Sequence, residues 1–471
     1  MRGSITYEAF GARGDGHADD MPAIIAAHAE ANRRGLPVRA AEGAVYYIAP
    51  RAATAVIRTD TDWTGARFVI DDRGLDVWTE PVFDVPPEET EAAFAPKTLE
   101  YGQTQIENPT GRTLYVTVFN DTHMDYIRWG ANQNSGSPRT DNFLVNADGS
   151  LPSPVSFDFD RITSVRARTL PEQTLHIRGG EFVTIANQQE SKYNYHRRNI
   201  CIRRSRTELS GLTHLVEGEL DHGAPYAAFL SVADCAEVCV HDCLLTAHRT
   251  YWTIGAAGTP VPMGSYDLGC SGSAGVSFRR IRQTTDILDR DYWGLTGTNH
   301  CRDLLFEDCR ISRFDAHMGV TNCTLRRCRF GFAGINAIGF GHFLIEDCET
   351  SGRALVNLRS DYGSTFRGGF TIRNCVWHPW EGMNALFCAA NRGIHDFGYT
   401  CCLPARVDID GLTVTDTDTL CVFCDWTGGE PCGPYPMVPP ERVTLMNVRG
   451  PKTVALCENP ALTAGTVYEG P

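Results

Sequence analysis

A short repeat in the second half of the chain constrains the fold more than any other feature. Strings of the form apolar-x-apolar-x-x-Cys-x-apolar recur at a minimum spacing of 19 to 20 residues, and looser copies extend the series from Gly180 to Val448. Each copy alternates apolar and polar residues with period 2, which predicts a β-strand. The clearest copies are VCVHDCLL, LLFEDCRI, CTLRRCRF, FLIEDCET and FTIRNCVW, which carry Cys243, Cys309, Cys328, Cys348 and Cys375.

A unit of this length cannot bury its own apolar face. Copies that stack along one axis form a continuous core, and the longer connections project from it as loops. The sequence therefore predicts an all-β chain folded as a parallel β-helix of about 10 to 11 rungs. In such a stack the five cysteines form an interior column of buried thiols.

The N-terminal segment has the features of a cap on such a stack. Residues 7–24 read YEAFGARGDGHADDMPAI and are followed by a helical stretch to Arg34 and by EGAVYYIAP at 42–50. The glycines suit turns, and Asp19 or Asp20 suits the first turn of a helix, where the helix dipole favours a carboxylate. We expect this helix to cover the exposed edge of the first rung.

These strings resemble the opening of the pectate-lyase-like β-helix superfamily. Its members begin with an FGAxGDGxxDDxxAI-like string, an amphipathic cap helix and a GxYxI-like first strand, and they include pectinases, rhamnogalacturonan-cleaving enzymes, epimerases and phage tailspike depolymerases. The resemblance implies a right-handed single-stranded parallel β-helix that acts on carbohydrates. One departure is Ala9, where the family usually has an acidic residue.

The repeat is lost between Asp71 and about Thr174, which predicts an insertion. We expect the cap helix and first rungs at 1–70, an inserted β subdomain at 71–174, the catalytic β-helix core at 175–450 and a C-terminal tail at 451–471. Within the insert, TLYVTVFN and HMDYIRWG alternate apolar and polar residues on either side of Asp121 and Thr122, which predicts a β-hairpin. We expect the insert to form one wall of a cleft.

Composition excludes several classes of partner. The chain has 43 basic and 57 acidic residues and a net charge of -14, so it repels a phosphate backbone and we expect no nucleic acid partner. The apolar stretches fall short of the roughly 20 residues that a membrane helix needs, so we expect no membrane partner. The first residues lack the apolar core of a signal peptide, which predicts a cytoplasmic protein, or a secreted one if the sequence is trimmed. The oligomeric state stays open.

Side chains that point outward on successive rungs must carry any chemistry on this scaffold, because the inward side chains form the core. Aligning the rungs on the cysteine column and counting in steps of two assigns an outward strip. Its acidic members are Asp289, Asp291 and Asp315. Its other members, interpreted as substrate-binding residues, are Arg249, Tyr251, Trp293, His317, Asn336, Asn357, Arg359 and Asp361.

Paired carboxylates are what the hydrolysis of a glycosidic bond needs, one as general acid and the other as base or nucleophile. We therefore predict Asp289, Asp315 and Asp291 as catalytic residues. One rung and two strand positions between Asp289 and Asp315 give a backbone separation of roughly 8 Å, which favours an inverting glycoside hydrolase. Repulsion among the aspartates would raise one pKa, while Arg359 and His317 bind or orient the sugar. The arrangement resembles the polygalacturonase branch, although the full signature strings of that branch are missing.

Two alternatives stay open. In a polysaccharide lyase, Asp289, Asp291 and Asp315 would hold calcium against a uronate, and an arginine or tyrosine of the strip would move the proton. A non-catalytic glycan-binding or tailspike-like protein would need no carboxylate pair. We expect a polysaccharide or oligosaccharide as the partner in each case, with no cofactor for a hydrolase and calcium only for a lyase.

Six further cysteines crowd the C-terminal third of the chain: Cys388, Cys401, Cys402, Cys421, Cys424 and Cys432. Cys421 and Cys424 have the two-residue gap that zinc sites often use, but no second closely matching pair accompanies them. Structural zinc, a disulfide and unpaired thiols stay as alternatives there.

Overall fold

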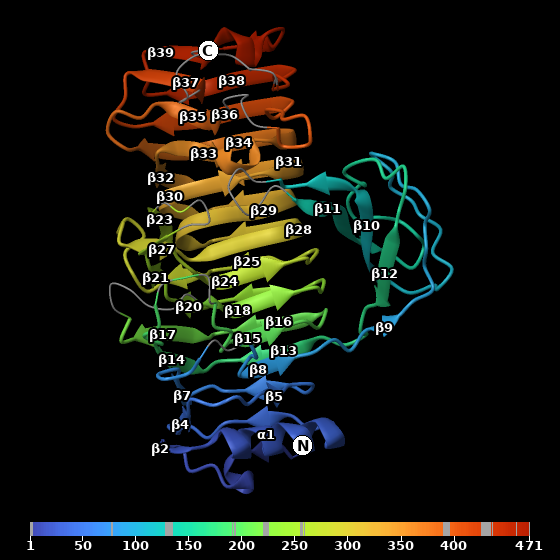
Figure 1. Cartoon of the computed structure of the whole chain (residues 1–471), viewed down its shortest axis with the longest axis vertical. Coiled ribbons are helices and arrows are strands. Elements are labelled where there is room, and N and C mark those ends of the chain that lie inside the picture. Colours follow the sequence, from blue (N-terminus) through green and yellow to red (C-terminus); the bar gives the residue numbers. More distant parts are fainter. Residues whose placement is uncertain are drawn as a thin grey trace. The chain divides into compact units, whose positions relative to one another are not determined.

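A computed structural model describes residues 3–76, 79–127, 135–190, 192, 195–219, 226–254, 258, 260–389, 396–424, 435, 437–457 and 459–470. The chain divides into two compact units. Unit 1 comprises Met1–Thr90 and Leu170–Thr296, and unit 2 comprises Glu91–Thr169 and Gly297–Pro471. Each unit contains its own stack of parallel strands (Figure 1).

Unit 1 coils through three parallel sheets, because each short strand pairs with a strand one turn away. The first sheet contains β1 (Ile5–Thr6), β3 (Val38–Arg39), β6 (Thr61–Asp62), β13 (Leu175–Arg178), β16 (Thr207–Ser210), β19 (Cys239–His241) and β25 (Ser277–Arg279). The second contains β2 (Asp15–Asp19), β4 (Val45–Ile48), β7 (Arg67–Asp71), β14 (Glu181–Ile185), β17 (Thr213–Glu217), β20 (Leu244–Leu245) and β26 (Arg282–Gln283). The third contains β5 (Ala55–Val56), β8 (Phe83–Val85), β15 (Ile200–Ile202), β18 (Ala227–Ala233) and β24 (Tyr266–Ser271).

Two antiparallel strand pairs follow β20 in unit 1. β21 (His248–Arg249) pairs with β27 (Tyr292–Gly294), and β22 (Tyr251–Ile254) pairs with β23 (Pro260–Met263). They lie outside the three parallel sheets.

The cap predicted at the N-terminus is present. After η1 (Glu8–Phe10), helix α1 (Met21–Arg34) packs against β1, β3, β4 and β5 and ends at Gly35, whose φ is 64°. Asp20 stands at the N-cap, but its carboxylate accepts hydrogen bonds from the backbone of the preceding loop, including Gly14 N at 3.1 Å. The first helical N–H, on Met21, donates instead to Asp19 Oδ1 at 3.2 Å.

Unit 2 also coils through parallel strands. One sheet contains β29 (Arg310–Arg326), β31 (Gly339–Glu346), β34 (Phe366–Pro379), β36 (Arg406–Val414), β38 (Arg442–Arg449) and β40 (Val467–Glu469). A second series of parallel pairs begins at the N-terminal half of β29. It continues through β30 (Arg329–Ala337), β33 (Ala354–Leu358), β35 (Ala385–Ala389), β37 (Thr419–Cys424) and β39 (Thr453–Cys457). β32 (Glu349–Gly352) pairs with β30 and β34. The remaining elements are β28 (Thr296–Glu307), η2 (Ser360–Tyr362) and η3 (Pro460–Thr463).

A left-handed residue before each repeat cysteine bends the coil of unit 2. These residues are Asp308, Arg327, Asp347 and Asn374, with φ of 56°, 50°, 54° and 50°. Asp and Asn adopt this conformation more readily than most residues, which explains their place in the repeat. The cysteines that follow are 2% exposed, and Cys309 N and Cys328 N donate to the sulfur of the next cysteine, Cys328 and Cys348, at 3.4 Å. The predicted interior column is confirmed for Cys309, Cys328, Cys348 and Cys375, and Cys243 is equally buried in unit 1.

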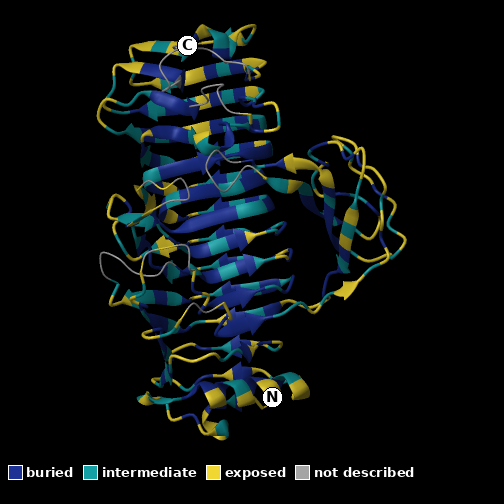
Figure 2. Cartoon of the chain, viewed as in Figure 1, coloured by how far each residue is buried: buried dark blue, intermediate teal, exposed yellow. Residues whose placement is uncertain are grey.

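Stacked aromatic side chains fill the core of each unit. In unit 1 the rings of Phe68 and Phe182 stack at 4.8 Å, and in unit 2 those of Phe343 and Phe370 stack at 5.0 Å. Burial is concentrated on the strands, while the connections are exposed (Figure 2). The predicted fold class is therefore confirmed: an all-β, right-handed parallel β-helix with an N-terminal cap helix and an inserted β subdomain.

The inserted subdomain is an antiparallel sheet. Its strands, in spatial order, are β11 (Ser137–Val145), β10 (Leu114–Asp125), β12 (Ser164–Thr169) and β9 (Thr90–Glu91). The predicted hairpin around Asp121 and Thr122 is wrong, because β10 passes through this point with an irregularity between Asn120 and Met124 and pairs with β11. The sheet also spans less than the predicted 71–174, since β8 pairs in parallel with β5 and β15 in unit 1.

A buried ion pair holds the insert against the β-helix of unit 2. Arg302 Nη1 lies 2.8 Å from Asp141 Oδ2, and both side chains are about 1% exposed. Burial raises the pKa of Asp141, and the Arg302 charge opposes that rise. Asn142 Nδ2 adds a hydrogen bond to the carbonyl oxygen of His300. These contacts place β10 and its last residues beside the β-helix.

Candidate functional site

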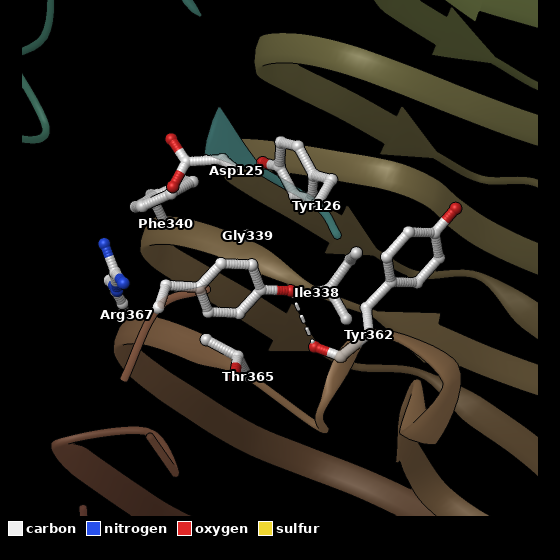
Figure 3. Close-up of a pocket in the computed structure, with 9 residues that line it drawn as sticks. Asp125, Tyr126, Ile338, Gly339, Phe340, Tyr362, Thr365 and Arg367 are labelled. Atoms are coloured by element: carbon white, nitrogen blue, oxygen red, sulfur yellow. Dashed lines mark hydrogen bonds between the residues drawn. The ribbon is translucent and has the colours of Figure 1, made fainter. Parts of the chain in front are cut away.

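A small cleft in unit 2 is the candidate binding site (Figure 3). The insert contributes one wall, as predicted, and the β-helix contributes the other. The lining residues are Asp125 and Tyr126 of the insert with Ile338, Gly339, Phe340, Tyr362, Thr365, Arg367 and Tyr399. The cleft therefore combines four aromatic rings with a carboxylate and a guanidinium.

Tyr126 enters the cleft wall through a space that only glycine leaves open. A Cβ on Gly319, whose φ is 84°, would lie 1.9 Å from the Tyr126 hydroxyl oxygen. The Tyr126 ring meets the rings of His300, Phe340 and Tyr362 edge-on, at centroid distances of 5.1, 6.2 and 6.4 Å. Burial raises the pKa of Tyr126 well above its usual value, so the phenol stays neutral.

Tyr399 and Arg367 also line the cleft. The Tyr399 hydroxyl donates to the carbonyl oxygen of Tyr362 at 3.0 Å (Figure 3). The Arg367 guanidinium lies 5.7 Å from the centroid of Phe340 and 5.8 Å from that of Tyr399, within cation–π range. Arg367 makes no ion pair with any residue that the structure describes, so its charge is available to a ligand.

An arginine bridges two predicted site residues next to the cleft. Arg359 Nη1 lies 3.1 Å from Asp315 Oδ1, while Nε and Nη2 of the same guanidinium lie 3.1 and 2.7 Å from the two carboxylate oxygens of Asp361. The guanidinium also lies 5.2 Å from the ring centroid of Tyr362, a cleft residue. Arg313 adds a second contact to Asp315, at 2.7 Å.

The predicted alignment of the rungs is correct in this part of unit 2. Asp315 is the register partner of Asn336, and Asn336 is that of Asn357. Asn357 Nδ2 donates to Asn336 Oδ1 at 2.7 Å, so the two amides form a ladder along the column. His317 follows Asp315 by two residues on β29, and its Nδ1 lies 3.0 Å from Asn299 Oδ1.

The expectation that this column faces solvent is wrong for Asp315 and Asn336. Asp315 is 0% exposed and Asn336 is 6% exposed. Two guanidinium groups, those of Arg313 and Arg359, contact the Asp315 carboxylate. Asp361, with a side chain 28% exposed, is the carboxylate of this cluster that solvent reaches.

The other predicted site residues lie in unit 1. Tyr251 is buried, with its hydroxyl 2.5 Å from Glu219 Oε1, and the Arg249 guanidinium lies 5.8 Å from the ring centroid of Tyr292. Trp293 packs closely over Gly264. Asp289 and Asp291 lie in a turn, in which Asp289 Oδ1 accepts a hydrogen bond from Asp291 N at 2.9 Å. The roughly 8 Å estimate assumed a strand at Asp289, so its premise is wrong.

Unit 1 contains a buried ionic chain that sequence reasoning missed. His248 Nδ1 lies 3.1 Å from Glu219 Oε1, and its Nε2 lies 3.2 Å from Asp267 Oδ1. Asp267 also accepts a hydrogen bond from His214 Nδ1 at 2.8 Å. At the other end of this series of contacts, the Tyr251 hydroxyl donates to Glu219. All five side chains are at most 9% exposed.

The two carboxylates keep His248 charged. Burial alone would lower the pKa of His248, but Glu219 and Asp267 raise it to about 10. Burial would likewise raise the pKa of Asp267, but His214 and His248 lower it to about 2. The charge on His248 and the charge on Asp267 therefore stabilise each other.

The missed residues carry weak signals in the sequence. Asp267 stands inside the apolar strand YDLGC, and a charge at such a position requires a buried partner. No local pattern predicts that Tyr126 and Tyr399 meet at one cleft, because they are 273 residues apart in the chain.

The predicted zinc or disulfide site at the C-terminal cysteines lies partly outside the described residues. The side chain of Cys424 and all of Cys432 are not described, so the zinc and disulfide alternatives at the C-terminal cysteines stay predictions. Elsewhere in the described ranges, no group of three or more His, Cys, Asp or Glu side chains is placed to hold a metal ion. Within those same ranges, no helix is long and apolar enough to cross a membrane.

Comparison with known proteins identifies the fold. No family model matches the chain, and no curated protein matches its sequence. Among solved structures, the chain is similar to the tailspike gp61 of Pseudomonas phage phi297, with a TM-score of 0.59 and 12% identity over 99% of this chain and 84% of that one. It is also similar to the tailspike gp49 of Pseudomonas phage LKA1, with a TM-score of 0.52 and 14% identity over 95% and 81% of the two chains.

A third similar structure contains a sugar. The Gp54 tailspike of Acinetobacter baumannii bacteriophage AP22, in complex with A. baumannii capsular saccharide, has a TM-score of 0.52 and 9% identity over 96% of this chain and 77% of that one. At these identities the likeness shows the fold alone. The chain is thus a parallel β-helix.

Proposed function

We propose that this chain is a carbohydrate-active protein that takes a polysaccharide into the cleft of unit 2 and hydrolyses its glycosidic bonds. The observation that carries the proposal is the composition of that cleft. Tyr126, Phe340, Tyr362 and Tyr399 surround it, and flat rings of this kind stack on the apolar faces of sugars. Arg367 and Thr365 supply polar groups for sugar oxygens. The tailspike that holds a capsular saccharide on a similar fold supports the same class of ligand.

The carboxylates for hydrolysis come from opposite walls in this proposal. Asp125 lines the insert wall, and Asp361 directly precedes Tyr362 on the β-helix wall. Asp361 is the partly exposed member of its cluster and acts as the base that activates water, while Asp125 protonates the leaving oxygen. This assignment moves the proposed chemistry from Asp289 and Asp291 to the cleft.

Asp315 acts as a positioning residue in this scheme. It is fully buried and holds Arg359, which in turn orients Asp361. The guanidinium groups of Arg313 and Arg359 make its surroundings positive, so it is a poor ligand for calcium. The calcium-dependent lyase is therefore the weaker alternative at this site.

A non-catalytic glycan-binding protein is the second candidate. Arg139 Nε lies 3.0 Å from Asp125 Oδ2, and Arg359 forms an ion pair with Asp361. Each carboxylate is thus already held by an arginine of the chain itself, which opposes a role in cleavage. This observation favours binding without cleavage.

A turnover and binding screen tests the proposal. Wild-type protein, Asp361→Asn and Asp418→Asn are incubated with polygalacturonate, alginate, xylan and laminarin, and reducing ends and ultraviolet absorbance of unsaturated products are read together. Asp418 is the matched control, because it is an exposed carboxylate of unit 2 paired with Lys452. New reducing ends that fall about 100-fold in Asp361→Asn alone support hydrolysis.

The other outcomes separate the alternatives. Absorbance that rises with the reducing ends would identify a lyase and overturn the hydrolase. Retention of a polysaccharide without any product would establish the binding protein. Equal turnover in all three proteins would remove Asp361 from the mechanism.

A further inference from the structure

A small apolar face projects from unit 1 on the strand pair β22 and β23. Trp252 is 67% exposed and Ile254 is 61% exposed. Their register partners on β23 are Pro262 and Pro260, which are also exposed. Because directly opposed residues of an antiparallel pair point to the same side, the indole lies beside the pyrrolidine rings on one face of the hairpin.

The opposite face of the hairpin is anchored. Tyr251 and Met263 oppose each other there, and both are buried. The Tyr251 hydroxyl is bonded to Glu219, which is joined through His248 to Asp267. A strand fastened in this way presents Trp252 in a defined place, so little conformational entropy is lost when a ligand binds to the indole.

The size of this face indicates the kind of occupant. Four side chains with one large ring present on the order of 400 Å². A stable protein interface needs about 800 Å² from each partner, so the face is too small for a second copy of the chain or another folded protein. It matches one or two sugar rings, whose C–H faces stack on an indole.

An exposed acidic residue is joined through its backbone to the strand that carries Trp252. Thr250 N donates to the carbonyl oxygen of Asp291 at 2.8 Å, which joins the exposed Asp291 to the strand that carries Trp252. A carboxylate accepts hydrogen bonds from the hydroxyl groups of sugars.

We propose that Trp252, with Ile254, Pro260 and Pro262, is a second saccharide-binding platform, separate from the cleft of unit 2. It rests on the proposed function only in that the ligand is a polysaccharide. The platform holds the polymer and takes no part in cleavage.

Affinity electrophoresis tests the platform. Wild-type protein, Trp252→Ala and the control Tyr101→Ala run through gels that contain polygalacturonate, alginate, xylan or laminarin. Tyr101 is a matched control, because it is an aromatic residue 73% exposed in the insert. We expect Trp252→Ala to weaken retardation about 10-fold in the gel that retards the wild type, and Trp252→Phe to restore most of it.

The outcomes separate this proposal from the proposed function. Trp252→Ala retarded like the wild type would overturn the platform and leave the cleft intact. Asp361→Asn run in the same gels should be retarded normally, because it leaves the platform in place. Absence of retardation for the wild type in every gel would overturn the platform and, if turnover is absent as well, the proposed function. Since Trp252 is exposed, we expect an unchanged melting temperature for Trp252→Ala.

Discussion

The guanidinium of Arg359 and the carboxylate of Asp315 lie 3.1 Å apart, with the carboxylate completely removed from solvent. Asp315 stands on β29 and Arg359 follows β33, so two strands of unit 2 are joined by the pair. Asp361 contacts the same guanidinium, and this shared arginine links the buried column to the edge of the cleft.

Removing Arg359 should destabilise the protein. Arg359→Ala removes one of the guanidinium groups that contact the buried Asp315, and we expect the free energy of unfolding to fall by about 3 kcal/mol. The double variant Arg359→Ala/Asp315→Asn should recover part of the loss, because it removes the buried charge. Urea unfolding followed by fluorescence measures both. Arg406→Ala is the control, since Arg406 is 66% exposed, and should cost less than about 1 kcal/mol. A double variant less stable than the single one would contradict this account.

The stability of unit 1 should fall at high pH through His248. Its pKa of about 10 in the folded protein lies above the value of about 6.5 in the unfolded chain. The stabilisation is therefore fully present below pH of about 6.5 and is lost as the pH rises through about 10. The groups that face His248 are Glu219, Asp267 and the ring of Tyr226.

The comparison variant for this prediction is His248→Gln. Its melting temperature should be lower at neutral pH, and the gap to the wild type should close as the pH approaches 10. At the acidic end, Asp267, with a pKa of about 2, should keep its contribution until the pH falls below its unfolded value of about 3.8. Parallel melting curves for the two proteins across the alkaline range would refute the charged His248.

A methyl group at residue 319 should close the cleft to a ligand. In Gly319→Ala the new Cβ meets the Tyr126 hydroxyl, so the ring must move and the cleft lining changes with it. We expect a loss of polysaccharide binding by the cleft in addition to about 1–2 kcal/mol of backbone strain. Gly382→Ala shares the positive φ, at 75°, but its Cβ meets nothing within 4 Å. Calorimetric titration should show binding by Gly382→Ala and weakened binding by Gly319→Ala, and equal affinities would show that Tyr126 does not shape the site.

The cysteine column should resist alkylation in the native protein. Cys309, Cys328, Cys348 and Cys375 are 2% exposed, and burial raises the pKa of Cys375 to about 12. A buried thiol with little thiolate reacts slowly. Iodoacetamide labelling read peptide by peptide should therefore modify the partly exposed Cys239 first and the column only after unfolding. Rapid native labelling of the column would show that these rungs open readily.

The repeat predicted the column of Asp315, Asn336 and Asn357 as well as the buried cysteines, because period-2 alternation is a local property that reports which face of a strand a residue occupies. Counting along the chain therefore aligned neighbouring rungs without the structure. It failed at Asp289, where the backbone leaves the strand for a turn.

What covers each face was decided only by the tertiary structure. Arg359 approaches Asp315 from 44 residues away and turns an expected surface carboxylate into a buried one. Tyr126 and Tyr399 meet at the cleft from segments 273 residues apart, and Glu219, His248 and Asp267 form one ionic chain from three separate segments. The alternation along a strand carries no information about distant loops. The sequence by itself therefore determined the coil and its register. Long-range packing decided which polar residues meet, which are buried and where a ligand can enter.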